Sequence, residues 1–204
     1  MKPKSILDIG TGFGKYGVLC REYLELWDGR QKYEFTRRID GVEVFGKYIT
    51  PLHKFVYNNI FSEDIVKLID RLDFKYELVL LIDVLEHYKD QGKWLLETIL
   101  SKSTGILIST PKNPSPQKDA FDNICETHRS RWTKDELSKI ANCNFTNDNI
   151  SFIIYITKDK NSLNKLQNGL KLLSMTRNKS LLKSLQKNFS SMIIIHKIYQ
   201  YIKK

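Results

Sequence analysis

The sequence predicts an α/β fold, a doubly wound and mostly parallel sheet of seven strands that ends in an antiparallel hairpin. Short apolar runs alternate with segments of helical periodicity through most of the chain. Such alternation is typical of a parallel sheet with helices on both faces. A glycine-rich stretch, GTGFG, follows the first apolar run directly, and the last two apolar runs are separated only by the turn-forming residues NDN.

The individual elements follow from apolar spacing and from turn and capping signals. The expected parallel strands are Ser5–Ile9, Ile39–Glu43, Val56–Ile60, Leu78–Ile82 and Ile106–Ser109. The helices expected between them are Tyr16–Trp27, Lys47–His53, Asp64–Arg71 and Gln91–Leu100. Farther along, Thr133 and Glu136 form the sequence pattern of a capping box, which predicts the start of another helix. The segment CNFTNDNISFIIYIT then predicts the hairpin, with its turn at residues 147–149.

The charge distribution divides the chain into two parts. The net charge is +10, and residues 158–204 hold 11 basic residues and one acidic residue, so residues 1–157 hold 22 of each. We therefore expect a neutral domain, residues 1–157, and a basic extension, residues 158–204, whose leucine spacing predicts two amphipathic helices. A neutral body argues against specific nucleic-acid binding. The basic extension is instead expected to contact a protein partner or pack on itself, with a membrane surface as the second choice and RNA as the third.

Cysteine usage and hydropathy indicate the cellular setting. The three cysteines are widely spaced and form no CxxC pair, which argues against a disulfide framework or a zinc site and fits a reducing cytoplasm. No run of about 18 apolar residues is present, so no membrane-spanning helix is expected. The start, MKPKSILDIG, does not have the pattern of a signal peptide. We expect a cytoplasmic protein.

The glycine-rich stretch predicts a ligand site at the end of the first strand. Gly10, Gly12 and Gly14 allow a tight turn and a close approach of the backbone to a ligand. Open parallel sheets bind ligands beyond the carboxyl ends of their strands. The phosphate-binding pattern GxxxxGK[ST] is absent, and Lys15 stands where a dinucleotide-binding GxGxxG would have its third glycine. Asp8, just ahead of the glycines, suits a cationic ligand better than a pyrophosphate.

Four strand ends together carry a family resemblance. The segment LDIGTGFGKYG resembles the first motif of class I S-adenosylmethionine-dependent methyltransferases, which have a Rossmann-like fold. The segments IDGVEVF and FSEDIVKL are similar to the motifs at the next two strand ends of that family. The segment LLIDVLEHYKD resembles the DVLEH motif of a bacterial branch. The likeness covers about residues 4–157 in matching order.

The resemblance implies that S-adenosylmethionine is the cofactor and that its methionine end lies over the glycines. On this basis Gly10, Gly12 and Gly14 pass beneath the methionine part. Asp8 orients the amino group through backbone or water, and Asp83 lies near the same end of the cofactor. A sulfonium and an α-amino group are both cationic, which agrees with the acidic residue ahead of the glycines.

The resemblance also assigns the nucleoside end of the cofactor. Glu43, at the end of the second strand, would accept hydrogen bonds from both ribose hydroxyls, as a carboxylate can. Val44, Phe45, Ile65 and Leu85 would enclose the adenine, and Asp64 would lie at its edge. The alternatives are structural, because Glu43 could be a solvated strand-end carboxylate and Asp64 could cap the following helix.

Two histidines are candidate catalytic bases. His87 in DVLEHYK and His128 in ETHRSRW could each accept a proton near neutral pH, and Glu86 and Glu126 are weaker candidates. The alternative for each histidine is a structural role, in which it anchors its loop. No cluster with the linear spacing of metal ligands is visible, so no metal site is expected.

The expected acceptor is an oxygen or nitrogen of a small molecule or a glycan intermediate. The motif [DN]PP[FYW], usual in enzymes that methylate base amino groups, is absent, and the chain has DVLEH in its place. Arg129, Arg131 and Lys112 could suit an anionic acceptor or could be ordinary surface charges. Two other functions remain open: a module that binds the cofactor without catalysis, and an NAD-dependent oxidoreductase.

Overall fold

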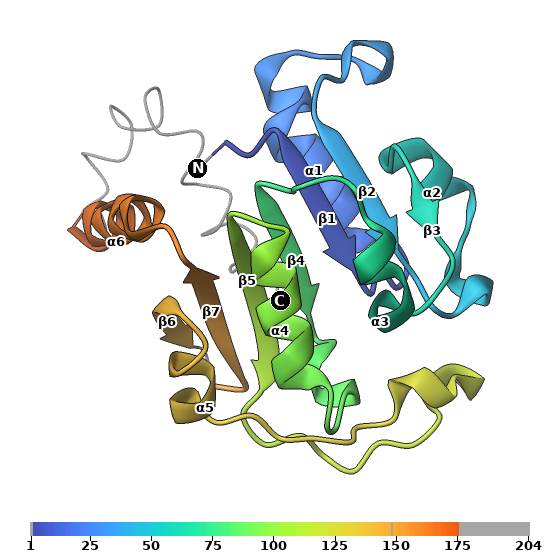
Figure 1. The fold of residues 1–204 in the computed structure, drawn as a ribbon. Helices are drawn as coiled ribbons and strands as arrows, with labels where there is room; N and C mark the ends of the chain where they lie inside the picture. The colour runs from blue at the N-terminus through green and yellow to red at the C-terminus, as the bar shows by residue number, and fades with distance from the viewer. Residues whose placement is uncertain (1, 148, 176–204) are drawn as a thin grey trace.

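The computed structural model describes residues 2–147 and 149–175, which form one seven-stranded sheet covered by helices (Figure 1). The strand order is β3-β2-β1-β4-β5-β7-β6. All strands are parallel except β7, which is antiparallel to both of its neighbours, β5 and β6. The strands are β1 (Ser5–Ile9), β2 (Arg38–Val42), β3 (Ile60–Phe61), β4 (Leu78–Ile82), β5 (Gly105–Pro111), β6 (Asn142–Asn147) and β7 (Ser151–Thr157). The α/β fold class predicted from the sequence is confirmed.

Helices cover both faces of the sheet. They are α1 (Lys15–Leu24), α2 (Pro51–Val56), α3 (Ile65–Leu68), α4 (Gly92–Ser101), α5 (Lys134–Ser138) and α6 (Lys160–Met175). One core cluster joins the sheet to α1 and α2, and a second, larger cluster joins it to α3, α4 and α5. Within residues 2–147 and 149–175, no helix combines the length and the apolar character needed to cross a bilayer.

The first strand shows why apolar residues follow one another directly in the parallel strands instead of alternating with polar ones. Ile6 packs into the cluster on the α1 side, and its neighbours Leu7 and Ile9 pack into the cluster on the α4 side. All three side chains are buried. Because alternate side chains enter two different cores, neither face of the strand needs polar residues. Two apolar cores stabilise the strands whose ends carry the motifs.

The strand order reverses between β1 and β4, which lie side by side at the centre of the sheet. From β1 the chain proceeds outward to β2 and β3, and from β4 it proceeds to β5 on the other side. Loops that leave two such strands diverge and open a crevice at their carboxyl ends. In Figure 1 these ends lie toward the bottom, where the long segment after β5 also passes.

The predictions around the third strand were wrong by several residues. Val56 ends α2 instead of beginning a strand, and the expected helix Lys47–His53 is replaced by a short 3-10 turn followed by α2. Proline has no N–H group and clashes inside a helix, so Pro51 can only begin one. Thr50 precedes it as the N-cap, and its backbone N–H donates to His53 Nδ1 over 3.1 Å.

The C-terminal elements agree with the sequence patterns where the structure describes them. Strands β6 and β7 form the predicted antiparallel pair, and α5 begins with the predicted capping box of Thr133 and Glu136. Helix α6, the first of the two predicted basic helices, packs against β6 and β7 and buries Leu166. Residue 148 of the turn and the second predicted helix lie outside the described residues.

Candidate active site

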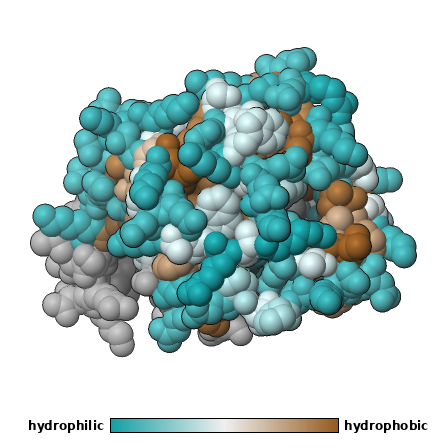
Figure 2. Space-filling model, turned by 60° about the horizontal axis from the view of Figure 1, so that its bottom comes forward, coloured by the Kyte–Doolittle hydropathy of each residue, from teal (hydrophilic) through white to brown (hydrophobic). Residues whose placement is uncertain are grey.

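A cavity of about 550 Å³ opens at the carboxyl ends of the central strands. Eight of the residues predicted to form the site line it: Gly10, Gly12, Glu43, Val44, Asp64, Ile65, Asp83 and His87. Of the other candidates, Asp8, Gly14, Phe45, Leu85 and His128 do not line it. Figure 2 shows the side of the molecule on which the parallel strands end, and this surface is mostly hydrophilic with small, separate hydrophobic areas.

The glycine loop is held against the end of β2 by its backbone. The N–H groups of Gly10 and Thr11 both donate to the carbonyl oxygen of Val42, over 2.9 and 3.2 Å. Gly10 and Gly12 have φ angles of +72° and +52°, in the left-handed region that favours glycine. A Cβ atom on Gly10 would lie 2.4 Å from Val84 Cγ2, whereas one on Gly12 would meet nothing within 4 Å. The loop therefore presents bare backbone to the cavity at Gly12.

Glu43 is joined to this loop by hydrogen bonds. Its Oε2 accepts from the N–H of Gly12 and its Oε1 from the N–H of Phe45, both over 2.8 Å. The side chain lines the cavity although the residue is only 4% exposed. Burial raises the pKa of the Glu43 carboxyl, against the opposing effect of the two N–H donors. The Thr11 hydroxyl also donates to Oε2, over a longer distance of 3.5 Å. A carboxylate has about four acceptor positions, so Glu43 can still accept a hydrogen bond from a ligand.

Asp8 lies beneath the glycine loop, outside the cavity. It is 1% exposed, and its Oδ2 accepts a hydrogen bond from the Tyr57 hydroxyl over 2.5 Å. Its Oδ1 has no partner among the residues that the structure describes. Burial raises the pKa of Asp8 to about 7, the Tyr57 hydrogen bond opposes this effect, and the nearby Glu43 charge adds to it. Any contribution of Asp8 to ligand binding must therefore pass through the loop.

The buried Asp8 carboxyl predicts that part of the folding stability is lost as pH rises. Its pKa is about 7 in the folded protein against an ordinary value of 3.8, so this stability is present below about pH 4 and lost through about pH 7. The variant Asp8→Asn should lack this dependence. Urea unfolding measures the free energy of unfolding of both proteins at pH 5 and at pH 8. Between these pH values the wild type should lose roughly 2–3 kcal/mol more of this free energy than the variant, at 1.36 kcal/mol per pKa unit. Equal losses in the two proteins would contradict the assignment.

Asp64 combines a helix-capping role with a place in the cavity wall. Its Oδ1 accepts hydrogen bonds from the Val66 N–H and from the Tyr88 hydroxyl, both over 2.9 Å. The first bond makes Asp64 the N-cap of α3, so the structural role considered for this residue is present. The second bond connects the segment after β3, which carries Asp64, to the segment after β4, which carries Tyr88. Because Asp64 and Ile65 both line the cavity, the cap also shapes this part of its wall.

Asp83 stands at the end of β4 in a strained backbone conformation. Its φ angle is +53°, uncommon for a residue other than glycine. The Asp83 N–H donates to the Ser109 carbonyl, and the Ser109 hydroxyl donates to Asp83 Oδ1, both over 2.9 Å. These two bonds to β5 hold the strained residue, which lines the cavity. Such strain is concentrated at functional sites.

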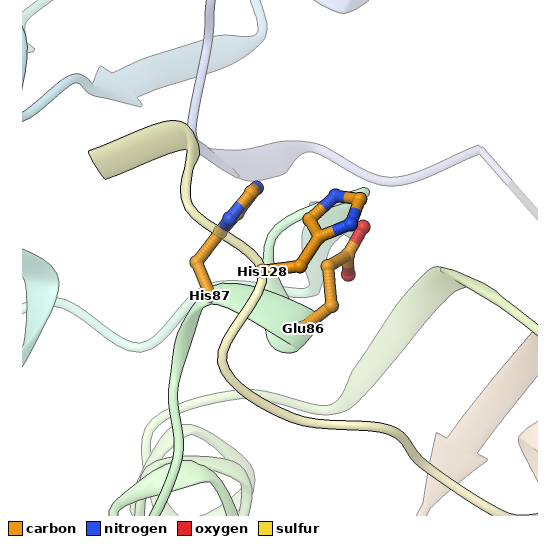
Figure 3. Close-up of side chains that lie close together, drawn as sticks. All are labelled: Glu86, His87 and His128. Atoms are coloured by element: carbon orange, nitrogen blue, oxygen red, sulfur yellow. The ribbon is translucent and has the colours of Figure 1, made fainter. Parts of the chain in front are cut away.

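The two candidate bases lie next to each other, although they are distant in sequence. Their ring centroids are 5.3 Å apart. The Nδ1 of His87 lies 3.0 Å from the Thr127 carbonyl oxygen, and the Nδ1 of His128 lies 2.8 Å from that of Ser115. Both rings therefore anchor loops, as the structural alternative required. Figure 3 shows the two rings beside the carboxylate of Glu86, which is buried.

Sequence reasoning missed part of the cavity wall. The residues that it did not single out are Ile9, Val42, Glu63, Val84, Tyr88, Lys89, Asp90, Gln91, Asn123 and Cys125. Most of them follow β4 or belong to the long segment after β5. Tyr88 and the acidic and amide residues near it directly follow the recognised DVLEH segment, which was the available signal. Asn123 and Cys125 belong to no recognised motif.

A family model described as a methyltransferase domain matches residues 1–147. Among curated proteins, nothing matches significantly. Solved structures similar to this chain include an O-methyltransferase family protein from Burkholderia thailandensis, at 10% identity and a TM-score of 0.54; the match covers 78% of this chain and 52%, or about half, of that one. Another is a SAM-dependent methyltransferase from Archaeoglobus fulgidus, at 18% identity and a TM-score of 0.52, with 76% of this chain and 86% of that one covered. A third is magnesium protoporphyrin IX methyltransferase from Synechocystis with bound SAH, at 14% identity and a TM-score of 0.50, with coverage of 76% and 74%.

Proposed function

Because this chain belongs to the methyltransferase domain family, we propose that it transfers a methyl group from S-adenosylmethionine to an oxygen or nitrogen of a small-molecule or glycan acceptor. It has the fold of class I S-adenosylmethionine-dependent methyltransferases. The observation that carries the proposal is the pairing of Glu43 with the Gly12 N–H on the wall of one cavity. This pairing joins a fixed carboxylate to bare backbone where the central strands end.

In the proposed complex the cofactor lies along the cavity from the glycine loop to α3. Gly10 and Gly12 pass beneath the methionine part, and Glu43 accepts hydrogen bonds from the ribose hydroxyls. Val44 and Ile65 enclose the adenine. The hydrogen bonds that fix Glu43 and the glycine loop support this placement. A group that is already fixed loses little conformational entropy when the ligand binds.

Three further residues complete the proposed cofactor site. Asp64 keeps one carboxylate oxygen available for the adenine edge, because the described bonds use only its Oδ1. Asp83 lies at the methionine end of the cavity. Gly14 and Asp8 act indirectly. Gly14 turns the chain into α1. Asp8 accepts from the Tyr57 hydroxyl, which in turn accepts from the Gly17 N–H in α1, so Asp8 helps to hold the helix that follows the loop.

Methyl transfer from a sulfonium is an in-line displacement, in which the acceptor atom bonds to the methyl carbon while the carbon–sulfur bond breaks. The protein mainly has to place the two reactants, and such placement can supply roughly 7–11 kcal/mol of the barrier. A base is needed only where the acceptor must lose a proton. His87, which lines the cavity, is the better placed of the two candidate histidines, and His128 lies behind it.

An anionic group on the acceptor would find a fixed positive charge at the cavity wall. Arg129 lines the cavity, and its guanidinium donates to the carbonyl oxygens of His87 and Ile124 over 3.2 and 3.0 Å. Arg131 instead donates to the Lys112 carbonyl oxygen over 3.0 Å and does not line the cavity. Of these two arginines, Arg129 is the one that we propose for binding an acceptor phosphate or carboxylate.

A turnover assay tests the proposed reaction. The protein is incubated with S-adenosylmethionine and separate pools of hydroxyl- and amine-bearing sugars, sugar phosphates and aromatic acids, and S-adenosylhomocysteine production is measured. We expect production above the acceptor-free rate with at least one pool. Cofactor binding without any turnover would favour the non-catalytic module, and NADH binding without S-adenosylmethionine binding would favour the oxidoreductase.

We propose that the protein works in a reducing compartment such as the cytoplasm, because its three cysteines are widely spaced in sequence and form no CxxC pair. We propose that residues 158–204 contact a protein partner or an anionic membrane surface through their basic residues.

A further inference from the structure

Three side chains with metal-ligand chemistry meet beside the cavity. Glu86 and His87 belong to the turn that follows β4, and His128 belongs to the long segment after β5. One potential ligand atom from each lies within 4.8 Å of the others. Figure 3 shows the two rings and the carboxylate pointing to the same side of the two loops that carry them.

Both histidines are held in the orientation and tautomer typical of metal ligands. A carbonyl oxygen can only accept a hydrogen bond, so the Nδ1 of His87 and the Nδ1 of His128 each carry a proton and donate it, to Thr127 and Ser115 respectively. In a neutral imidazole the other nitrogen, Nε2, then bears the lone pair. Metal-binding histidines almost always donate their second ring nitrogen to a carbonyl or carboxylate in this way.

The surroundings of the carboxylate favour a cation. Glu86 is 2% exposed and receives one side-chain hydrogen bond, from the Thr110 hydroxyl over 3.1 Å. The negative charges of Asp83 and Glu126 act on it unfavourably. A buried carboxylate near two others is costly unless a positive charge compensates it. Arg129 lies nearby, but the bonds described for its guanidinium are to backbone carbonyl oxygens.

We propose that Glu86, His87 and His128 bind a divalent first-row transition metal ion, with zinc as the best match. Two imidazoles and one carboxylate form a known catalytic zinc set that leaves one position open, whereas magnesium and calcium prefer oxygen ligands alone. Ligand atoms about 2.0–2.1 Å from a tetrahedral zinc lie about 3.4 Å apart. The three side chains therefore close by roughly 1 Å when the ion binds. This proposal departs from the expectation of no metal site, which rested on linear spacing.

The position of the ion relative to the cavity gives it a role in the reaction, and this step rests on the proposed function. His87 lines the cavity and is also one of the three residues of the proposed metal site. An ion held there can bind an acceptor hydroxyl at its open position and lower the pKa of that hydroxyl, as metal-bound water is acidified. The acceptor class is then an alcohol, a phenol or a vicinal diol, methylated on oxygen. The two histidines act as ligands and not as bases.

Metal binding is tested directly on full-length, tag-free protein stripped of metal with a chelator. Cobalt(II) is titrated while the visible absorption of tetrahedral cobalt is recorded, and zinc is titrated by calorimetry. We expect one equivalent of each to bind. The variants His87→Ala, His128→Ala and Glu86→Gln should each weaken binding by more than the roughly 10–100-fold that the loss of an outer-shell partner costs.

One substitution outside the cluster serves as a control. Glu97→Gln removes an exposed carboxylate of α4, and this variant should bind zinc within about 3-fold of wild type. For the His128→Ala variant, S-adenosylhomocysteine titration reports folding independently of metal binding, because His128 does not line the cofactor cavity. No stoichiometric metal binding by protein that binds S-adenosylhomocysteine, or equal affinity in the wild type and the His128→Ala variant, would overturn the proposal. Metal binding without cofactor binding would instead contradict the proposed function alone.

Discussion

Replacing Glu43 with glutamine is expected to lower the affinity for S-adenosylhomocysteine at least about 100-fold. In the proposed complex the carboxylate accepts two hydrogen bonds from the ribose, and bonds to a charged group contribute about 1.5–3 kcal/mol each. Glutamine has one acceptor oxygen, and its amide nitrogen would face the N–H of either Gly12 or Phe45, which now donate to the two carboxylate oxygens. Isothermal titration calorimetry measures the change.

The matched control is Glu97→Gln, which removes a carboxylate of the same length from the exposed face of α4. Glu97 forms a surface ion pair with Lys93 over 3.9 Å, and such pairs contribute little. Its affinity should remain within about 2-fold of wild type. Thermal unfolding of Glu43→Gln checks that the variant is folded. If a folded Glu43→Gln variant bound S-adenosylhomocysteine as tightly as the control, the proposal that Glu43 binds the ribose would be contradicted.

Replacing Gly10 with alanine is expected to destabilise the protein by about 2–5 kcal/mol. The left-handed conformation, with a φ angle of +72°, costs an alanine about 1–2 kcal/mol. The new Cβ would also lie 2.4 Å from Val84 Cγ2, and overpacking of this kind costs typically 1–3 kcal/mol. Urea unfolding of wild type and variant measures the sum.

Gly12→Ala separates the two contributions. Its φ angle of +52° is also left-handed, but a Cβ there meets nothing within 4 Å, so only the conformational cost of about 1–2 kcal/mol applies. In a Val84→Ala background, Gly10→Ala should be less destabilising than in wild type, because the side chain that the new Cβ would contact has been removed. Equal destabilisation by Gly10→Ala in the presence and absence of the Val84 side chain would contradict the close-contact explanation.

The parts of the fold that the sequence predicted well are those where local pattern and packing agree. The bounds of β1 and β4 were predicted correctly because both are short, mainly apolar segments, β4 apolar throughout and β1 apolar except for Ser5 and Asp8. The third strand was misplaced because Val56 is buried in either a helix or a strand, and apolar character alone does not distinguish them. Pro51 was the overlooked signal, since it can begin a helix but cannot lie inside one.

The candidate site was predictable where each residue follows its own strand. Glu43, Asp64 and Asp83 each stand just after a strand or in the next turn, so a parallel sheet brings them to one edge. The proximity of His128 to His87 has a different origin. It depends on the path of the long segment after β5, which returns to the turn after β4 through backbone bonds such as Arg129 N–H to the Glu86 carbonyl. Linear spacing carries no information about such a return.

A crystal structure of the protein with S-adenosylhomocysteine tests the central claim most directly. The account predicts electron density for the ligand in the 550 Å³ cavity, with both ribose hydroxyls within hydrogen-bond distance of Glu43 and the homocysteine part over Gly10 and Gly12. Density for the ligand elsewhere, or a ribose that makes no contact with Glu43, would contradict it.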